Sequence, residues 1–284
     1  MTTTFGARLR AAMEAYGPFC AGLDPHRSLI ERWGLEYSVA GLERFAMACV
    51  EAYEGQVAVV KPQSAFFEVF GSGGLRVLER VLADLRDAGT LTLLDVKRGD
   101  IGSTMQAYAE AYLGKDSDLR ADAITLSPFL GYASLRPALD LAEETGRGVF
   151  VLALTSNPEG PEVQHAVRSR RSVAGGVVDG ATADNAAATA RGELGSVGLV
   201  IGATVGDAVS ELGLDLASAN TPLLVPGLGA QGGTVEAVLR TFGGALPQVL
   251  ASSSREVLSA GPSVAALRTA ARSASDRLRE ALSA

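Results

Sequence analysis

Short apolar runs alternate with longer segments of helical periodicity along almost the whole chain, and this alternation restricts the possible folds most strongly. Eight of the runs have the character of buried strands. They span residues 19–23, 57–60, 91–96, 123–126, 149–154, 197–201, 223–225 and 249–252. Strands that alternate with helices lie parallel, so the pattern predicts one α/β domain, a single (β/α)8 TIM barrel over residues 1–284. A doubly wound open sheet is the alternative, because alternation alone does not show that a sheet closes.

The segments between these runs carry apolar residues three and four positions apart, as the buried face of a helix does. The clearest are residues 42–53, 75–85, 135–142 and 235–239, with a last helix at about 263–282. Gly55, Gly89 and Gly146 follow three of them and are typical helix stops. The sixth and seventh helices are the weakest, since they are short or rich in alanine and glycine.

Residues 158–184 break the alternation, because they are long, polar and rich in glycine and arginine. We interpret them as an excursion from the connection after the fifth strand. Two interpretations stay open, a mobile flap over the site and a variable surface insertion.

Composition excludes several classes of function. The net charge is −7, and the one dense basic cluster, Arg168, Arg170 and Arg171, has no aromatic residues among it, so we expect no nucleic-acid partner. No window approaches eighteen apolar residues and the first residues lack a signal-peptide pattern, so we expect no membrane partner and a cytoplasmic protein. Cys20 and Cys49 stand in apolar surroundings and are expected in the core.

Metal and triad chemistry also lack support in the pattern. The two histidines, His26 and His165, are far apart and have no partners at metal-ligand spacing, so neither a zinc site nor a Ser/His/Asp triad is expected. No Walker loop or dinucleotide fingerprint follows the first strand.

Candidate polar residues gather where the predicted strands end. They are Asp24, Lys61, Asp95, Lys97, Ser127, Ser156 and Arg255. The carboxyl ends of barrel strands converge on one mouth, which is where the active sites of such barrels lie. We therefore expect these side chains to surround one site.

Asp95 and Lys97 stand two apart on an otherwise apolar strand, so they share a face. One interpretation is a buried ion pair that closes the barrel end. The other interpretation is a functional site. Lys61 and Asp100 favour it, because closing the end of a barrel does not require four charges of alternating sign.

Residues 226–233 form a glycine-rich loop after the seventh strand, and Gln231 adds a side-chain donor. Arg255 follows the eighth strand. Loops after strands seven and eight are the usual phosphate site of this fold, and arginine matches the geometry of a phosphate. The glycines alone could serve only as turns, but together with Arg255 they favour phosphate binding.

With these residues the chain resembles the orotidine 5′-monophosphate decarboxylases, in particular their longer bacterial branch. The family's Asp-x-Lys-x-x-Asp run stands here as Asp95-Val96-Lys97-Arg98-Gly99-Asp100, with Ile101 and Thr104 following as the family has them. The loop at residues 226–233 is also close to the family pattern. The matches extend from Asp24 to Arg255, which is almost the whole barrel.

The resemblance implies a cofactor-free, metal-free decarboxylation of orotidine 5′-monophosphate (OMP) to uridine 5′-monophosphate (UMP), the last step of de novo pyrimidine synthesis. It implies an alternating charge network in which Lys97 protonates C6 of the pyrimidine. The members of that network would be Lys61, Asp95, Lys97 and Asp100.

The remaining roles also come from the resemblance. Asp24 and Lys61 would hold the ribose hydroxyls, Ser156 the pyrimidine, and Gln231 and Arg255 the 5′-phosphate. Asp100 and Thr104 would reach the neighbouring subunit's site in a homodimer, and Ile101 beside them is also expected to bind substrate.

Two local departures and two rival functions remain. Ser254 stands where shorter members have glycine, and the excursion at 158–184 is longer than in compact members.

One rival function is that of a metal-assisted decarboxylase or aldolase of the same barrel type. The cation of Lys61 argues against it, since Mg²⁺ prefers oxygen ligands. The other is a non-catalytic barrel that binds a nucleotide, in which one of the four charges could be neutral.

Overall fold

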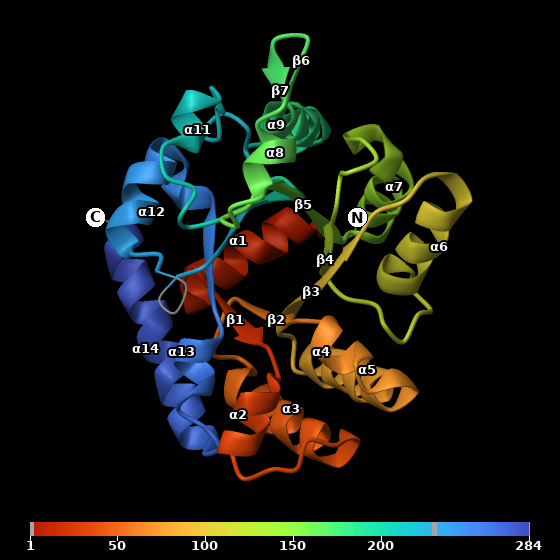
Figure 1. Ribbon diagram of the computed structural model, residues 1–284, viewed down its shortest axis with the longest axis vertical. Coiled ribbons are helices and arrows are strands. Elements are labelled where there is room, and N and C mark those ends of the chain that lie inside the picture. The colour runs from red at the N-terminus through yellow and green to blue at the C-terminus, as the bar shows by residue number, and fades with distance from the viewer. Residues whose placement is uncertain (1–2, 229–231, 284) are drawn as a thin grey trace.

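Eight parallel strands close into one barrel in the computed structural model, which describes residues 3–228 and 232–283 (Figure 1). The strands follow one another around the barrel in chain order, and β1 pairs with β10 to close it. They are β1 (Phe19–Leu23), β2 (Val59–Pro62), β3 (Leu91–Arg98), β4 (Ala123–Leu126), β5 (Gly148–Leu154), β8 (Val197–Ile201), β9 (Leu223–Pro226) and β10 (Val249–Ser253). Closure excludes the open sheet and confirms the predicted (β/α)8 barrel; each predicted strand overlaps an observed one.

Helices surround the barrel (Figure 1). The longer ones are α3 (Val39–Tyr53), α5 (Gly71–Asp87), α6 (Gly102–Leu113), α7 (Arg136–Thr145), α9 (Val173–Asp184), α12 (Val235–Phe242) and α14 (Val264–Ser283). Short helices lie in the connections between the strands and the longer helices. They are α2 (Arg27–Arg32), α4 (Ala65–Glu68), α8 (Gly160–Gln164), α10 (Ala186–Ala190), α11 (Ala208–Glu211), α13 (Arg255–Leu258) and the 3-10 helices η1 (Tyr132–Leu135) and η2 (Gly243–Gln248). None of the helices described in residues 3–228 and 232–283 combines the length and apolar character needed to cross a membrane.

The predicted helix signals work as expected. The face of α5 that repeats every three or four residues is buried, and its members are Val77, Leu78, Val81, Leu82 and Leu85. Helix α7 ends at Gly146, whose φ of 68° is left-handed and therefore suits glycine. The side chain of Thr234 accepts a hydrogen bond from the backbone N–H of Ala237 and caps α12.

Helix α1 (Phe5–Tyr16), which the sequence pattern did not indicate, lies across the barrel at the amino ends of the strands (Figure 1). Its Phe5, Leu9 and Met13 are buried among inward-facing strand residues. The Phe5 ring packs edge-on against Phe150, with 6.0 Å between ring centroids. A Cβ at Gly148 would lie 2.2 Å from the Phe5 ring, so glycine makes room for this contact. The amino end of the barrel is thereby covered, and the carboxyl end is left for the site.

The expectation of an excursion over residues 158–184 was wrong for its last 12 residues, which form helix α9 (Val173–Asp184). Helix α9 packs against β5 and β8 and buries Ala174, Val177, Val178 and Ala181, so it is the barrel helix after the fifth strand. Its glycines concealed the helical periodicity. The real excursion consists of α8 and a two-stranded hairpin, β6 (Val167–Arg168) with β7 (Arg171–Ser172), which projects from the barrel in Figure 1.

Candidate active site

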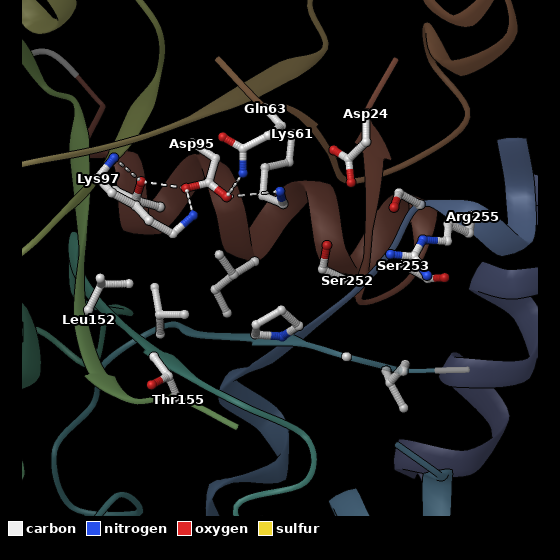
Figure 2. Close-up of a pocket in the computed structure, with 17 residues that line it drawn as sticks. Asp24, Lys61, Gln63, Asp95, Lys97, Leu152, Thr155, Ser252, Ser253 and Arg255 are labelled. Carbon is white, nitrogen blue, oxygen red and sulfur yellow. Dashed lines mark hydrogen bonds and ion pairs between the residues drawn. The ribbon is translucent and has the colours of Figure 1, made fainter. Parts of the chain in front are cut away.

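A cavity of about 240 Å³ opens at the carboxyl ends of the barrel strands. Figure 2 shows charged side chains along one side of it and apolar ones along the other. The charged residues are Asp24, Lys61, Asp95, Lys97 and Arg255, all of them predicted from their positions at strand ends. The barrel thus brings together residues from β1, β2, β3 and the segment after β10.

Asp95 is the centre of a dense hydrogen-bond network (Figure 2). Its Oδ1 lies 2.6 Å from the Lys97 ammonium and accepts from the Thr125 hydroxyl at 2.8 Å. Its Oδ2 lies 3.2 Å from the Lys61 ammonium and accepts from the Gln63 amide at 2.8 Å. Both oxygens are engaged by two donors each, so the carboxylate is held in one orientation.

These contacts keep the Asp95–Lys61 pair ionised although both residues are buried. Burial alone would raise the pKa of Asp95, but the charges of Lys61 and Lys97 and the hydrogen bonds from Lys97 and Thr125 hold it well below its usual range. Burial alone would lower the pKa of Lys61, but the charges of Asp24 and Asp95 raise it above its ordinary value. The site therefore carries fixed charges throughout the neutral range.

Lys97 has an unusual backbone. Its φ of 46° lies in the left-handed region, which residues other than glycine rarely occupy. The pairing of β3 with β4 shifts register between Leu94 and Arg98, and the Lys97 N–H donates to the Thr125 hydroxyl at 2.9 Å instead. The predicted contact between Asp95 and Lys97 therefore forms, but through a distorted strand end. Such strain is typical of functional sites.

Arg98 holds this distorted segment from its outer side. Its guanidinium donates to Glu68 on α4 at 2.8 Å and to the Tyr112 hydroxyl on α6 at 3.2 Å. The guanidinium also lies over the rings of Tyr108 and Tyr112. The end of β3 is thereby tied to both neighbouring helices.

Asp24 presents an unused acceptor beside this network. Its Oδ1 is buried and has no hydrogen-bond partner in the described part of the chain. A buried acceptor without a partner costs free energy, so a donor from a bound molecule would stabilise it. Hydroxyl groups of a ligand can supply that donor.

The opposite side of the cavity is apolar. Leu152, Val200, Leu224 and Pro226 line it, with Thr155 at its edge. Figure 2 places Leu152 and Thr155 across the cavity from Lys97. A flat ring could lie against this wall with one edge toward the ammonium group.

Arg255 lies at the other end of the cavity from Lys97 (Figure 2). It is exposed, and no residue within 3–228 or 232–283 accepts a hydrogen bond or forms an ion pair with its guanidinium. Gly227, with a φ of 101°, lines the cavity at the start of the glycine-rich loop. An anionic group could bind here. Gln231, expected to assist, lies outside the described residues.

Ser254, the departure noted in the sequence, also lines this end of the cavity. A Cβ added at Gly22 would lie 2.5 Å from the Ser254 Cβ, so glycine on β1 leaves room for the serine side chain. The departure is therefore accommodated by the neighbouring strand.

Five of the predicted site residues do not line this cavity. Ser127 is half-buried after β4, where its backbone N–H donates to the Arg98 carbonyl at 2.7 Å. Asp100, Ile101 and Thr104 follow β3 on its outer side, where Ile101 and Thr104 are exposed and the Asp100 carboxylate accepts from the Ile101 N–H at 2.8 Å. Ser156 is exposed beyond β5, and Thr155 lines the cavity in its place. Of the four charged residues expected to form one network, Lys61, Asp95 and Lys97 meet in the cavity of a single chain, and Asp100 does not.

Sequence reasoning missed Gln63, Thr125 and Thr155. Gln63 stands two residues after Lys61 and pairs with Asp95 in an isolated bridge, so the two-residue periodicity of a strand could have found it. Thr125 is a buried hydroxyl on an apolar strand, which is also a visible signal. Thr155 differs from Ser156 by one position, and no pattern distinguishes the two.

The geometry describes a site for a ligand with an anionic group at one end, hydroxyls in the middle and a flat ring at the other end. The ring would lie between an apolar wall and a carboxylate flanked by ammonium groups. Within the described residues no three histidine, cysteine, aspartate or glutamate side chains gather as metal ligands would. Both oxygens of Asp95 are already engaged by donors.

Comparisons with known proteins agree with this geometry. The model of the "Orotidine 5′-phosphate decarboxylase / HUMPS family" matches residues 17–270. An orotidine 5′-phosphate decarboxylase of Streptomyces coelicolor is 56% identical over 284 residues, which cover 99% of both chains. One of Salinispora arenicola is 58% identical over 269 residues, 94% of each chain. A crystal structure from Streptomyces avermitilis, of a protein described by the same enzyme name, has a TM-score of 0.94 at 55% identity and covers 100% of this chain and 97% of its own.

Proposed function

Because the chain belongs to the orotidine 5′-phosphate decarboxylase / HUMPS family, we propose that the cavity at the carboxyl ends of its strands is where OMP is decarboxylated. The chain is a carboxy-lyase that converts OMP to UMP, the last step of pyrimidine nucleotide synthesis. One observation carries the assignment of the site. Asp95 is a buried carboxylate flanked by the ammonium groups of Lys61 and Lys97, with an apolar wall opposite and, at the far end, Arg255, whose guanidinium has no partner among the described residues.

The substrate's three parts match the three regions of the cavity. The 5′-phosphate binds Arg255 and the loop that begins at Gly227, with Gln231 as a further donor. The ribose hydroxyls bind Asp24, whose Oδ1 lacks a partner among the described residues, and Lys61. The pyrimidine lies against the apolar wall, with Ser156 or its neighbour Thr155 at the ring edge.

Loss of CO₂ leaves an electron pair in the plane of the ring at C6, and the nearby Lys97 ammonium stabilises it. The same group then delivers its proton to C6. Its side chain is 48% exposed and lines the cavity, so it can reach a ligand, whereas the Lys61 side chain is only 9% exposed. Lys61 therefore holds Asp95 in place, and Lys97 performs the proton transfer.

Asp95 lies against the departing carboxylate. Two unit charges about 4 Å apart repel by about 4 kcal/mol at an effective dielectric near 20. Enzymes lower barriers by roughly 8–23 kcal/mol, so this repulsion alone is too small. The larger part comes from stabilisation of the carbanion and from binding energy at the phosphate end.

A second chain completes the site in this proposal. Asp100 and Thr104 do not line their own chain's cavity, and three large apolar side chains near them are exposed. Ile101 is 62% exposed at the start of α6, and Phe129 and Leu130 are 76% and 53% exposed after the neighbouring strand β4. An apolar surface of this kind is typical of a subunit interface. A homodimer would cover it and bring Asp100 and Thr104 to the neighbour's site.

Mixing two inactive variants tests this shared site. Lys97→Ala removes the proton donor of a chain's own site, and Asp100→Ala removes a residue given to the neighbour. A mixed dimer then has one site with both residues intact. If chains pair at random, co-expression should restore about a quarter of the wild-type rate of OMP loss, followed by ultraviolet absorbance.

The matched control pairs Lys97→Ala with Lys61→Gln, whose residues belong to one and the same site, so no mixed dimer has an intact site and activity stays absent. A Lys97→Ala and Asp100→Ala mixture that remains as inactive as this control would refute the shared site. The cytoplasmic location stays a prediction from sequence.

A further inference from the structure

A second cavity, of about 340 Å³, lies at the opposite end of the barrel from the proposed active site. It is formed where β3, β4 and β5 begin, since Thr92, Asp122 and Arg147 line it. Four arginines from separate segments converge on it. They are Arg8 on α1, Arg86 on α5, Arg120 before β4 and Arg147 before β5. A chain whose net charge is −7 thus concentrates positive charge at one place.

Asp122 is the one carboxylate among the described residues that line this cavity. Its Oδ1 accepts from Arg8 at 2.5 Å. Its Oδ2 accepts from the N–H and the hydroxyl of Thr92 at 3.0 and 3.1 Å. Both carboxylate oxygens are therefore engaged, and four guanidinium groups face a single negative charge.

Two guanidinium nitrogens are buried in this cluster without a hydrogen-bond partner in the described parts of the chain. They are Nη1 of Arg86 and Nε of Arg147. Burial lowers the pKa of Arg147, and the charges of Arg8, Arg120 and Arg86 lower it further although Asp122 opposes them. An unsatisfied buried donor and mutual repulsion both cost free energy, and a bound anion would remove both costs.

A purely structural role explains three of the arginines. Arg8 donates to the Gly146 carbonyl at 2.9 Å, Arg120 to that of Ser117 at 2.7 Å and Arg147 to that of Ala121 at 2.5 Å. It does not explain Arg86, whose guanidinium donates to no residue within 3–228 or 232–283. Arg86 is half-buried among three other arginines and has no hydrogen-bond partner in the described part of the chain, which fits a side chain that binds a ligand.

We propose that this cavity binds a small anion that carries a phosphate or diphosphate group. Guanidinium groups suit such oxyanions because their planar N–H donors match the oxygen positions. Thr3 also lines the cavity, and its hydroxyl can add a neutral donor, whereas the hydroxyls of Thr92 and Thr145 already donate to Asp122 and to the Leu141 carbonyl. The site is separate from the OMP site, because the barrel interior and α1 lie between the two ends.

The test compares variants in an Arg255→Gln background, which weakens anion binding at the active site. Pyrophosphate is titrated against sodium chloride of equal ionic strength while thermal unfolding is followed. At about ten times its Kd, pyrophosphate should raise the Tm of the background protein by about 2–4 °C. Adding Arg86→Gln should abolish that rise. Because Arg86 makes no internal hydrogen bond in the described structure, this variant should also unfold no earlier than its parent without anion.

Arg76→Gln is the matched control, since Arg76 is exposed on the same helix and does not line the cavity. It should retain the pyrophosphate effect. Inorganic phosphate and UTP are tested alongside. If phosphate raises the Tm at the lower concentration, the ligand is a free inorganic anion; if UTP does, it is the phosphate chain of a nucleotide. No specific rise in the Arg255→Gln protein, or a rise that persists after Arg86→Gln, would overturn the proposal.

Discussion

Replacing Lys97 with alanine should lower kcat for OMP decarboxylation by at least about 10⁴-fold, while the Kd for UMP changes by less than about tenfold. A positioned proton donor contributes about 10²–10⁴-fold, and one electrostatic stabiliser of a developing charge about 10²–10³-fold. Lys97 would serve as both. The phosphate, ribose and ring contacts belong to other residues, so nucleotide binding should persist. Absorbance assays give kcat, and calorimetry with UMP gives the Kd.

Lys115→Ala is the control for the loss of a lysine, since Lys115 is exposed at the end of α6, away from the cavity. It should act like the wild type. Turnover by Lys97→Ala within about tenfold of wild type would remove Lys97 from the role of proton donor. Loss of UMP binding in the same variant would show that Lys97 chiefly holds the nucleotide.

Asp95→Asn should reduce both activity and stability. In the proposed mechanism the amide removes the negative charge that repels the departing carboxylate and orients Lys97, so kcat should fall by about 10²–10³-fold. It also leaves the buried ammonium of Lys61 without its closest anion, and breaking such a pair costs about 3 kcal/mol or more. Urea unfolding measures that cost. A variant as stable as the wild type would contradict the account.

A double variant separates the two effects. In Asp95→Asn with Lys61→Gln the unpaired charge is gone, so the double variant should unfold at higher urea concentration than Asp95→Asn alone, yet stay inactive. A double variant less stable than the single one would show that Lys61 is not destabilised by the loss of Asp95.

The wild-type pair should stabilise the fold evenly across neutral pH. The pKa of Asp95 is lowered in the folded chain, so its contribution is full above the unfolded pKa near 3.9 and is lost as the pH falls through the folded pKa. The pKa of Lys61 is raised, so its contribution is full below about 10.4 and is lost as the pH rises through the folded pKa. Between about pH 5 and 9 neither group titrates.

The barrel could be predicted from sequence because each strand is a compact apolar run and helical segments separate the runs. Helices α1 and α9 could not be predicted in this way. Helix α1 covers the barrel end and is not part of the strand–helix alternation, and α9 contains glycines that serve packing. Gly180 lies against the ring of Tyr132 and Gly175 against the side chain of Arg171. These glycines would predict a loop in the sequence, but in the structure they allow close packing of a helix.

The charges of the site were visible in the sequence, but their arrangement was not. The Asp-x-Lys spacing predicts that Asp95 and Lys97 meet, whereas the left-handed backbone of Lys97 depends on Thr125, from another strand. The strand pattern also does not show that Asp100 and Thr104 lie outside the cavity of their own chain, because it places every polar residue after a strand at the same mouth.

The most direct test of the central claim is the ultraviolet absorbance of OMP mixed with the purified wild-type protein after EDTA treatment, at neutral pH. If the side chains of Asp95, Lys97 and Lys61 suffice for decarboxylation, the absorbance should fall at the rate of untreated protein, and added Mg²⁺ should not change that rate. An absorbance that stays constant in EDTA and falls only after Mg²⁺ is restored would contradict the account and favour a metal-assisted barrel enzyme.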